Sequence, residues 1–282
     1  GQTDDLAPAD RRLYALRDVT ATVSSIPLIV ASILSKKLSE GLDALVLDVK
    51  FGSGAFMETA EQAEQLAEAL VAVSQANGVA CNALLTDMSQ PIGRCVGNAL
   101  EIAESIETLR GEGPADTWEL TEALAVQMLL LAGEARYPDE AREAVWAVRD
   151  SGRALARFAE MISAHGGQAA VVDDPSLLPQ APHIEDVTAG FEGRISAIDA
   201  RCVARAGHVV GVGRERADQP VDSAVGIELL VEPGDVVRAD QTIARLHWRD
   251  KGRDEAIEFL RSALIKDGPV RPRVGRVRSV VS

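Results

Sequence analysis

Cysteine is scarce in this 282-residue chain, and so are the patterns that mark secreted, zinc-binding or membrane proteins. The three cysteines, Cys81, Cys95 and Cys202, lie far apart and form no CxxC pair, which argues against a disulfide framework or a zinc ribbon. No apolar run approaches the roughly 18 residues that a membrane span requires, and no signal-peptide pattern opens the chain. We therefore expect a cytosolic protein with no membrane partner.

Basic residues are also outnumbered, with 29 Lys and Arg against 43 Asp and Glu and a formal net charge of -14 at pH 7. Such a field repels phosphate backbones, so nucleic acid is not an expected partner. Any anionic substrate must be captured by a local cationic site that works against this field. Each inward-facing Arg or Lys is therefore informative.

The first part of the chain carries the signals of a strand–helix–strand unit. A helix is expected over Ser25–Leu38, because Ser25 can cap it, Pro27 stands at an early position and a glycine follows its end. The apolar run Ala44–Val49 predicts a buried parallel strand, and Val79–Asp87 predicts a second one. The helix joining these strands begins with Thr59 and Gln62 at capping-box spacing.

The remainder predicts helices and then a small β-rich module. Residues 97–165 have helical periodicity interrupted at glycines, and a proline-rich linker follows near residue 175. Short apolar runs separated by Gly and Pro, closed by one helix, predict the β-rich module. The expected fold class is α/β, a mixed sheet with helices, with an extended arm after Pro269. The expected domains are a helical remnant at 1–40, an α/β portion at 41–175 and the β-rich module at 184–268.

Three polar residues stand out in the apolar stretch "YALRDVTATVSSIPLIVASILSKK". Ser32 and Lys36 are spaced i and i+4 and so project from one helix face, while Arg17 lies upstream in another segment. By spacing alone, Lys36 can be a solvated lysine, Ser32 a helix-packing residue, and Arg17 a surface partner of Asp10 or Asp18.

The same three residues suit a planar heterocycle with two carbonyl groups and an N–H between them. Cationic donors would meet the carbonyl oxygens, and a hydroxyl can both donate and accept. If such a ring leaves a glycosidic bond, negative charge grows on it as the bond breaks. Donors fixed in advance would stabilise that transition state by roughly 3 kcal/mol each, by analogy with an oxyanion hole.

The glycine-rich stretch "KFGSGAF" after the first strand allows two interpretations. Its backbone N–H groups could face an anion, but it lacks a GxGxxG or GxxxxGK[ST] pattern, so an ordinary tight turn is favoured. Lys50 is the residue there that mutation should test. The four histidines are isolated from one another in sequence and predict no metal pair.

Four segments together resemble the thymidine and pyrimidine-nucleoside phosphorylases, in order and over nearly the whole chain. They are "DRRLYALRDVTATVSSIPLIVASILSKKL", "EGLDALVLDVKFGSGAFM", "LLTDMSQPIGRCVGNALEI" and "AVGIELLVEPGDVV". The resemblance implies a pentosyltransferase that cleaves a pyrimidine nucleoside with inorganic phosphate, with thymidine favoured and uridine also accepted. It implies that Tyr14, Arg17, Ser32 and Lys36 bind the base, with Arg17 and Lys36 as the catalytic residues.

The resemblance carries further expectations about state and partners. It implies nucleoside salvage or catabolism by a cytoplasmic homodimer, with phosphate as co-substrate and no organic cofactor. The family's phosphate-binding segments precede anything in this chain, so we expect the C-terminal two-thirds of such an enzyme, inactive by itself. The stretch "PIGRCVGNALEIAE" resembles the family's potassium site, which implies a monovalent cation at the carbonyls of Ile92 and Cys95 and the carboxylate of Glu104.

Two alternatives stay open at this point. An anthranilate-type phosphoribosyltransferase shares the general architecture, but it would need a pyrophosphate-binding loop and magnesium carboxylates that the sequence does not display. A non-catalytic module that binds pyrimidines without turnover would keep Arg17, Ser32 and Lys36. Calorimetry with thymine against ribose 5-phosphate would separate these alternatives.

Overall fold

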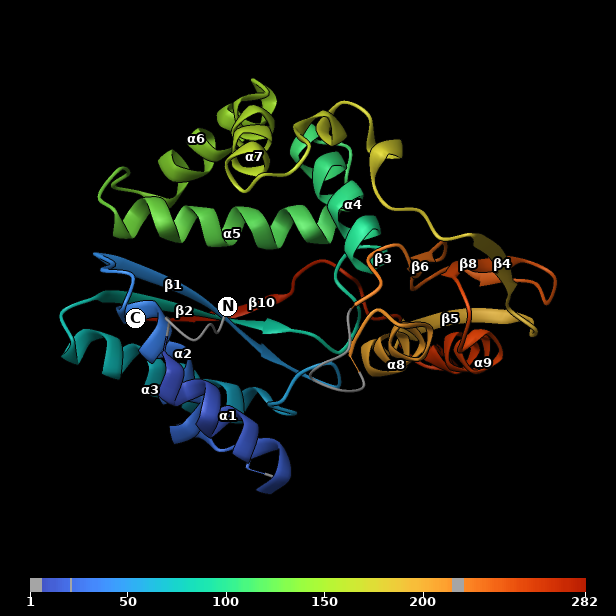
Figure 1. Ribbon diagram of the computed structural model, residues 1–282, viewed down its shortest axis with the longest axis horizontal. Helices are drawn as coiled ribbons and strands as arrows, with labels where there is room; N and C mark the ends of the chain where they lie inside the picture. The colour runs from blue at the N-terminus through green and yellow to red at the C-terminus, as the bar shows by residue number, and fades with distance from the viewer. Residues whose placement is uncertain (1–6, 21, 215–220) are drawn as a thin grey trace. The chain divides into compact units, whose positions relative to one another are not determined.

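The computed structural model describes residues 7–20, 22–214 and 221–282 (Figure 1). The chain divides into two compact units, and each is described by itself. The first unit comprises Gly1–Met88, Thr121–Glu143 and Arg276–Ser282, and the second comprises Ser89–Leu120 and Ala144–Gly275. The domain boundaries expected from the sequence remain predictions.

The elements follow the predicted order of helix, strand, helix and strand, then helices, then a β-rich part. The α-helices are α1 Pro8–Thr20, α2 Ile26–Leu38, α3 Ala60–Ala76, α4 Asn98–Arg110, α5 Ala115–Leu131, α6 Pro138–Asp150, α7 Arg153–Ala164, α8 Ala200–Val210 and α9 Arg253–Ala263. The strands are β1 Ala44–Phe51, β2 Ala80–Asp87, β3 Cys95–Val96, β4 His183–Thr188, β5 Gly193–Ile198, β6 Gly226–Leu229, β7 Val236–Val237, β8 Thr242–Trp248, β9 Leu264–Lys266 and β10 Val277–Val281. Short 3₁₀ turns lie at Ala169–Val172 and Pro175–Leu177.

The first unit is built on a three-stranded sheet in the order β1-β2-β10. β1 and β2 are parallel, with Ala44 opposite Ala80 and Phe51 opposite Asp87, as the strand–helix–strand pattern predicts. β10 is antiparallel to β2, so the expected extended arm ends as a strand of this sheet. The mixed sheet and the α/β class are therefore confirmed.

Helices cover both faces of this sheet (Figure 1). α2 and α3 pack on one face, where Val30 and Leu34 of α2 join a buried cluster with residues of β1, α3 and β2. Burying two such side chains contributes roughly 1.5–3 kcal/mol each. α3 begins with the predicted capping box of Thr59 and Gln62. Residues of α5 lie over the other face, where Asn82 donates to Gln127 at 2.8 Å.

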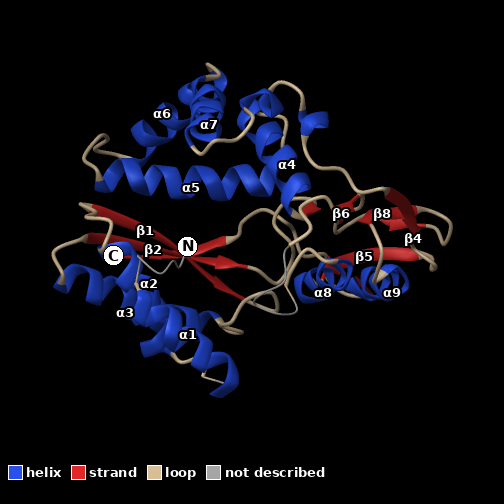
Figure 2. Cartoon of the chain, viewed as in Figure 1, coloured by secondary structure: helices blue, strands red, loops and turns tan. Residues whose placement is uncertain are grey.

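The second unit holds two antiparallel sheets, in the orders β3-β6-β8-β4 and β7-β5-β9. α8 and α9 lie side by side against them and contribute to one apolar core that includes Val203, Ile227, Leu246 and Leu260 (Figure 2). The predicted β-rich module is confirmed. Within the described ranges, none of the helices combines the length and apolar character needed to cross a lipid bilayer.

Candidate functional site

A small cavity of about 200 Å³ lies in the first unit where α1, α2 and the turn after β1 meet. Its lining residues are Arg17, Val23, Ile29, Ser32, Ile33 and Phe56. Most of this wall is apolar, and its two polar side chains come from residues that the sequence singled out. Arg17 and Ser32 are 5% and 7% exposed, so both are held away from bulk solvent at this cavity. The structure thus brings together two of the predicted base-binding residues.

Arg17 reaches the cavity from α1 while it braces the connection to α2. Its guanidinium donates to the carbonyl oxygens of Val23 and of Leu28, the latter at 3.2 Å. A guanidinium has five N–H donors in a planar fork, so one group can bond the main chain and also face the cavity. These two bonds hold the Arg17 guanidinium at the cavity wall.

Ser32 and Lys36 meet on one face of α2, as their spacing predicts. The Lys36 ammonium donates to the Ser32 hydroxyl at 3.1 Å and to the Ser32 carbonyl oxygen. Its remaining donor contacts the carboxylate of Asp10 in α1 at 2.6 Å. Lys36 is not part of the cavity wall, so it reaches the cavity through Ser32.

The remaining predicted base-binding residue, Tyr14, belongs to α1, but its side chain lies outside the part of the chain that the structure describes. Sequence reasoning missed Phe56, which lines the cavity although 69% of it is exposed. The "KFGSGAF" stretch could have indicated Phe56. A phenylalanine at the end of a glycine-rich turn lies on a loop, where it has no core to pack into. Sequence reasoning also missed that Asp10 pairs with Lys36, because no short-range pattern links residues 26 positions apart.

The N–H groups of the glycine-rich turn are bonded to main-chain carbonyls, within the turn and after β2. The N–H groups of Gly52, Gly54 and Ala55 donate to main-chain carbonyl oxygens, which supports the tight-turn interpretation over an anion site. Lys50 instead donates to Asp48 and, at 3.0 Å, to Thr86 on the neighbouring strand. Burial lowers the pKa of Lys50, and the bonded Asp48 opposes that shift.

Glu104, the predicted cation ligand, is a buried carboxylate in the second unit. It accepts from the backbone N–H of Arg94 at 2.7 Å and from that of Cys95 at 3.4 Å. Burial raises the pKa of Glu104, and the two backbone bonds oppose that rise. Burial also raises the pKa of the Cys95 thiol. A thiol kept protonated is a poor cation ligand, so any role of Cys95 would come from its carbonyl oxygen.

The backbone at Cys95 has the orientation that such a role requires. Leu229 donates to the carbonyl of Arg94 at 2.8 Å, and Cys95 stands opposite Glu228 in the β3–β6 ladder. Hydrogen-bonded and non-hydrogen-bonded pairs alternate in an antiparallel ladder, so both peptide groups of Cys95 point away from β6. Its N–H meets Glu104, and its carbonyl faces the same side. The Cys95 carbonyl and the Glu104 carboxylate thus place oxygen atoms, the donors that hard cations prefer, on one side of β3.

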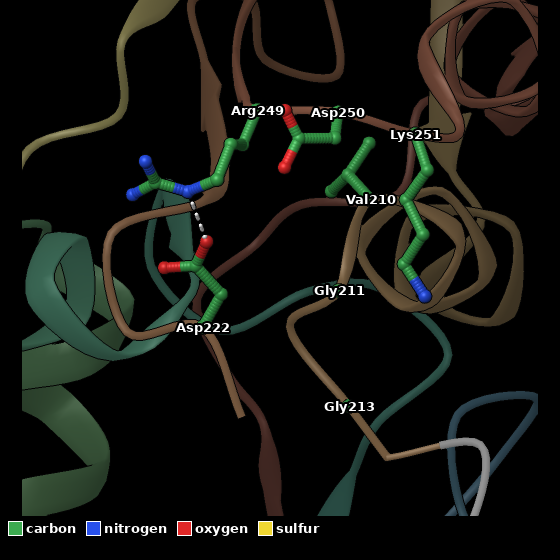
Figure 3. Close-up of a pocket in the computed structure, with 7 residues that line it drawn as sticks. All are labelled: Val210, Gly211, Gly213, Asp222, Arg249, Asp250 and Lys251. Carbon is green, nitrogen blue, oxygen red and sulfur yellow. Dashed lines mark hydrogen bonds and ion pairs between the residues drawn. The ribbon is translucent and has the colours of Figure 1, made fainter. Parts of the chain in front are cut away.

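A second hollow, of about 170 Å³, lies in the second unit beside the C-terminal end of α8 (Figure 3). Arg249 and Asp222 turn toward one another there and pair at 2.8 Å, while Lys251 lies on the opposite wall. The pairing with Arg249 lowers the pKa of Asp222. Since Arg249 is paired with a carboxylate of the same wall, this hollow is a weaker candidate than the cavity at Arg17. Among the described residues, no group of three or more His, Cys, Asp and Glu side chains could hold a metal ion.

Comparison with known proteins agrees with the order of these parts. Residues 1–155 match the family described as "Glycosyl transferase family, a/b domain", and residues 194–265 match the "Pyrimidine nucleoside phosphorylase C-terminal domain". A pyrimidine-nucleoside phosphorylase of Bacillus subtilis (strain 168) is 47% identical over 91% of this chain and 59% of its own length. Proteins of the same name from Staphylococcus haemolyticus (strain JCSC1435) and Staphylococcus aureus (strain bovine RF122 / ET3-1) are 44% and 43% identical, over 92% and 96% of this chain and 60% and 63% of their own lengths. The chain therefore spans about 60% of the length of these relatives.

Proposed function

Since this chain belongs to the thymidine and pyrimidine-nucleoside phosphorylase family, we propose that it serves in the phosphorolysis of pyrimidine nucleosides. The single observation that carries the proposal is the cavity at α1 and α2, with Arg17 and Ser32 in an otherwise apolar wall. At about 200 Å³ the cavity is smaller than the roughly 300–1,000 Å³ pockets that hold drug-sized ligands, which suits a single ring.

In the proposed reaction an oxygen of inorganic phosphate attacks C1′ of the sugar as the bond from C1′ to N1 of the base breaks. The electron pair of that bond passes to the base, which leaves as an anion and is then protonated, and the sugar keeps the phosphate at C1′. The transition state has oxocarbenium character, as in glycoside hydrolysis. No covalent intermediate with the protein is required, so its contribution is to orient the substrates and stabilise the departing base.

Each cavity residue has a defined role in this scheme. Arg17 donates to a carbonyl oxygen of the base, and because the guanidinium is cationic, the contact strengthens as the base becomes anionic. Ser32 donates its hydroxyl proton to the ring while it accepts from Lys36, so Lys36 acts on the base through Ser32 or by exchanging one of its present acceptors. Phe56 packs on the ring face at the open side of the cavity.

Finer features belong to the same proposal. We expect thymidine as the favoured substrate, with uridine also accepted, and a cytoplasmic homodimer as the working form. The match at residues 194–265 favours this reaction over phosphoribosyl transfer, because that family is described as a pyrimidine nucleoside phosphorylase domain. Since the chain spans about 60% of its relatives' length, we also expect the 282 residues to cleave no nucleoside by themselves.

A monovalent cation such as potassium completes the proposal. The carboxylate of Glu104 and the carbonyl oxygens of Ile92 and Cys95 would hold it, and the ion would supply positive charge that offsets the buried carboxylate. The assignment is supported if potassium chloride raises the stability of the chain and choline chloride at equal ionic strength does not. An equal response to both salts would contradict it.

Calorimetry with thymine and uracil tests the base site directly on this chain. Binding that is lost in Arg17→Ala and weakened in Lys36→Ala is the expected result. Turnover is tested by joining this chain to the part of the Bacillus subtilis relative that it does not match, and by following thymine release from thymidine with and without phosphate. Phosphate-dependent release by the joined protein but not by the 282 residues is expected. Wild-type kcat/KM in both variants of the joined protein would refute the assigned roles.

A further inference from the structure

The ammonium of Lys36 is held by three acceptors, and Asp10 supplies the negatively charged one. The Asp10 carboxylate lies 2.6 Å from the Lys36 ammonium, and the other two acceptors both belong to Ser32. The Asp10 side chain is 9% exposed and that of Lys36 is 21% exposed, so the pair is largely shielded from water. It joins α1 to α2 within one hydrogen bond of the cavity wall at Ser32.

The next lysine of the same helix provides the contrast. Lys37 pairs with Glu40 at 3.3 Å, three residues along the chain, and both side chains are 44% exposed. A pair of that kind is screened by solvent and contributes little. A shielded pair behaves differently, because removal of one partner leaves the other charge uncompensated. Asp10 is therefore placed to govern both the position and the effective charge of Lys36.

We propose that Asp10 is a positioning residue that fixes the Lys36 ammonium against Ser32 and limits the positive charge at the cavity, so that the site accepts the neutral pyrimidine ring. The inference rests on the proposed function, since it assigns a further residue to the same base site. Arg17 lines the cavity, Lys36 bonds the Ser32 that lines it, and the Asp10 carboxylate pairs with Lys36. Without the Asp10 carboxylate, the site would favour a base that is already anionic. During turnover, the site would then hold the departing base too tightly.

The test compares two ligands that differ in acidity rather than in shape. 5-Fluorouracil loses its ring proton more readily than uracil, so the ratio of their affinities reports how strongly the site prefers an anion. An uncompensated nearby charge shifts such equilibria by one or more pK units, so in Asp10→Asn we expect the preference for 5-fluorouracil to rise by about tenfold. Asparagine keeps the size and an oxygen acceptor, so a loss of packing alone would not change this ratio.

Calorimetry on the 282-residue chain gives the affinities, with Glu40→Gln as the matched control because it removes the carboxylate from the neighbouring lysine pair. The control should keep the wild-type ratio. In a Lys36→Met background, Asp10→Asn should no longer alter the ratio, since its effect passes through Lys36. An unchanged ratio in folded Asp10→Asn, or an equal change with Lys36 absent, would overturn the inference.

Asp10→Glu keeps the test decisive if Asp10→Asn does not fold. It retains the charge but moves it by one methylene, so uracil should bind a few-fold more weakly while the preference between the two ligands stays within about twofold of wild type. Unchanged uracil affinity in Asp10→Glu would contradict the positioning role. Failure of the wild-type chain to bind either ligand would refute the base site itself, whereas wild-type binding without these shifts would refute the role of Asp10 alone.

Discussion

The cavity at Arg17 and the hollow at Arg249 both place an arginine on a concave surface, yet their partners differ in kind. Arg17 donates to two backbone carbonyls and is 5% exposed, so main-chain groups hold it at the cavity. Arg249 pairs with the Asp222 carboxylate, and its side chain is 44% exposed. The comparison teaches that the partner of a charged group, more than the presence of a hollow, identifies a binding site.

The comparison extends to a third region. Glu104 is likewise a buried charge that backbone groups hold, here two N–H donors at the start of β3, and the Arg94 guanidinium lies 3.7 Å from its carboxylate. If backbone partners mark charges that act on a ligand, Glu104 should respond to a cation, whereas Arg249 and Asp222 should behave as a solvated surface pair.

The largest effect is expected for Arg17→Ala. Loss of a hydrogen bond from a charged donor should weaken uracil binding by about 10- to 100-fold. The two carbonyls that Arg17 braces would lose their partner, so the free energy of unfolding should fall by about 2–5 kcal/mol. Calorimetry and urea unfolding measure the two effects. Arg12→Ala, on the exposed side of α1, is the control and should change neither. Retained uracil affinity in Arg17→Ala would contradict the difference between the cavity at Arg17 and the hollow at Arg249.

A pair of glycine substitutions tests how tightly Glu104 is held. Gly41 and Gly93 have nearly the same left-handed backbone, with φ of +70° and +68°. A Cβ at Gly41 would meet nothing within 4 Å, whereas one at Gly93 would lie 2.1 Å from Oε2 of Glu104. Both alanine variants should lose about 1–2 kcal/mol to the backbone. Gly93→Ala should lose a further 1–3 kcal/mol, about the cost of unpaired groups, because the carboxylate must leave its backbone donors.

Urea unfolding followed by circular dichroism gives this difference. Equal losses in the two glycine variants would mean that Glu104 moves aside freely, and that its backbone bonds do not fix it.

Glu104→Gln should change how stability depends on pH. Burial raises the pKa of Glu104 above its usual 4.5, so the folded state binds more protons than the unfolded state in that window. The stabilisation of the folded state that results from this raised pKa is present below pH 4.5. It is lost as the pH rises through the pKa of Glu104 in the folded state. The glutamine variant should lack this fall and should leave one backbone N–H without an acceptor, at about 1–3 kcal/mol.

Thermal unfolding across pH measures the effect. Glu107→Gln is the control, because Glu107 lies on the same helix and contacts the same Arg94 but its side chain is 46% exposed. A parallel pH profile for both variants would show that burial of Glu104 has no energetic consequence.

The smallest effect is expected for Asp222→Asn. Its side chain is 32% exposed, so the pair with Arg249 should contribute less than about 1 kcal/mol to stability. Uracil binding at the α1–α2 cavity should be unchanged. A loss of stability as large as that of Arg17→Ala would show that the hollow in Figure 3 is more than a surface feature.

Much of the first unit could be predicted because its signals are local. The Thr59 capping box, the position of Pro27 and the apolar run from Ala44 each depend on residues within one turn or strand, and each is confirmed. The Ser32–Lys36 contact is of the same kind, since helical spacing alone puts the two residues on one face. Contacts between distant residues could not be read in this way, because no periodicity relates their positions.

The sequence by itself therefore determined the class of the fold, the order of its elements and the helix face that carries Ser32 and Lys36. Only the tertiary structure decided that Asp10 pairs with Lys36 across 26 residues, that Phe56 lines the cavity, and that the chain's last strand joins the first sheet. The physical reason is that helix caps and amphipathic faces are set by neighbours along the chain, whereas an ion pair, a cavity wall and an added strand depend on how packed elements bring remote residues together.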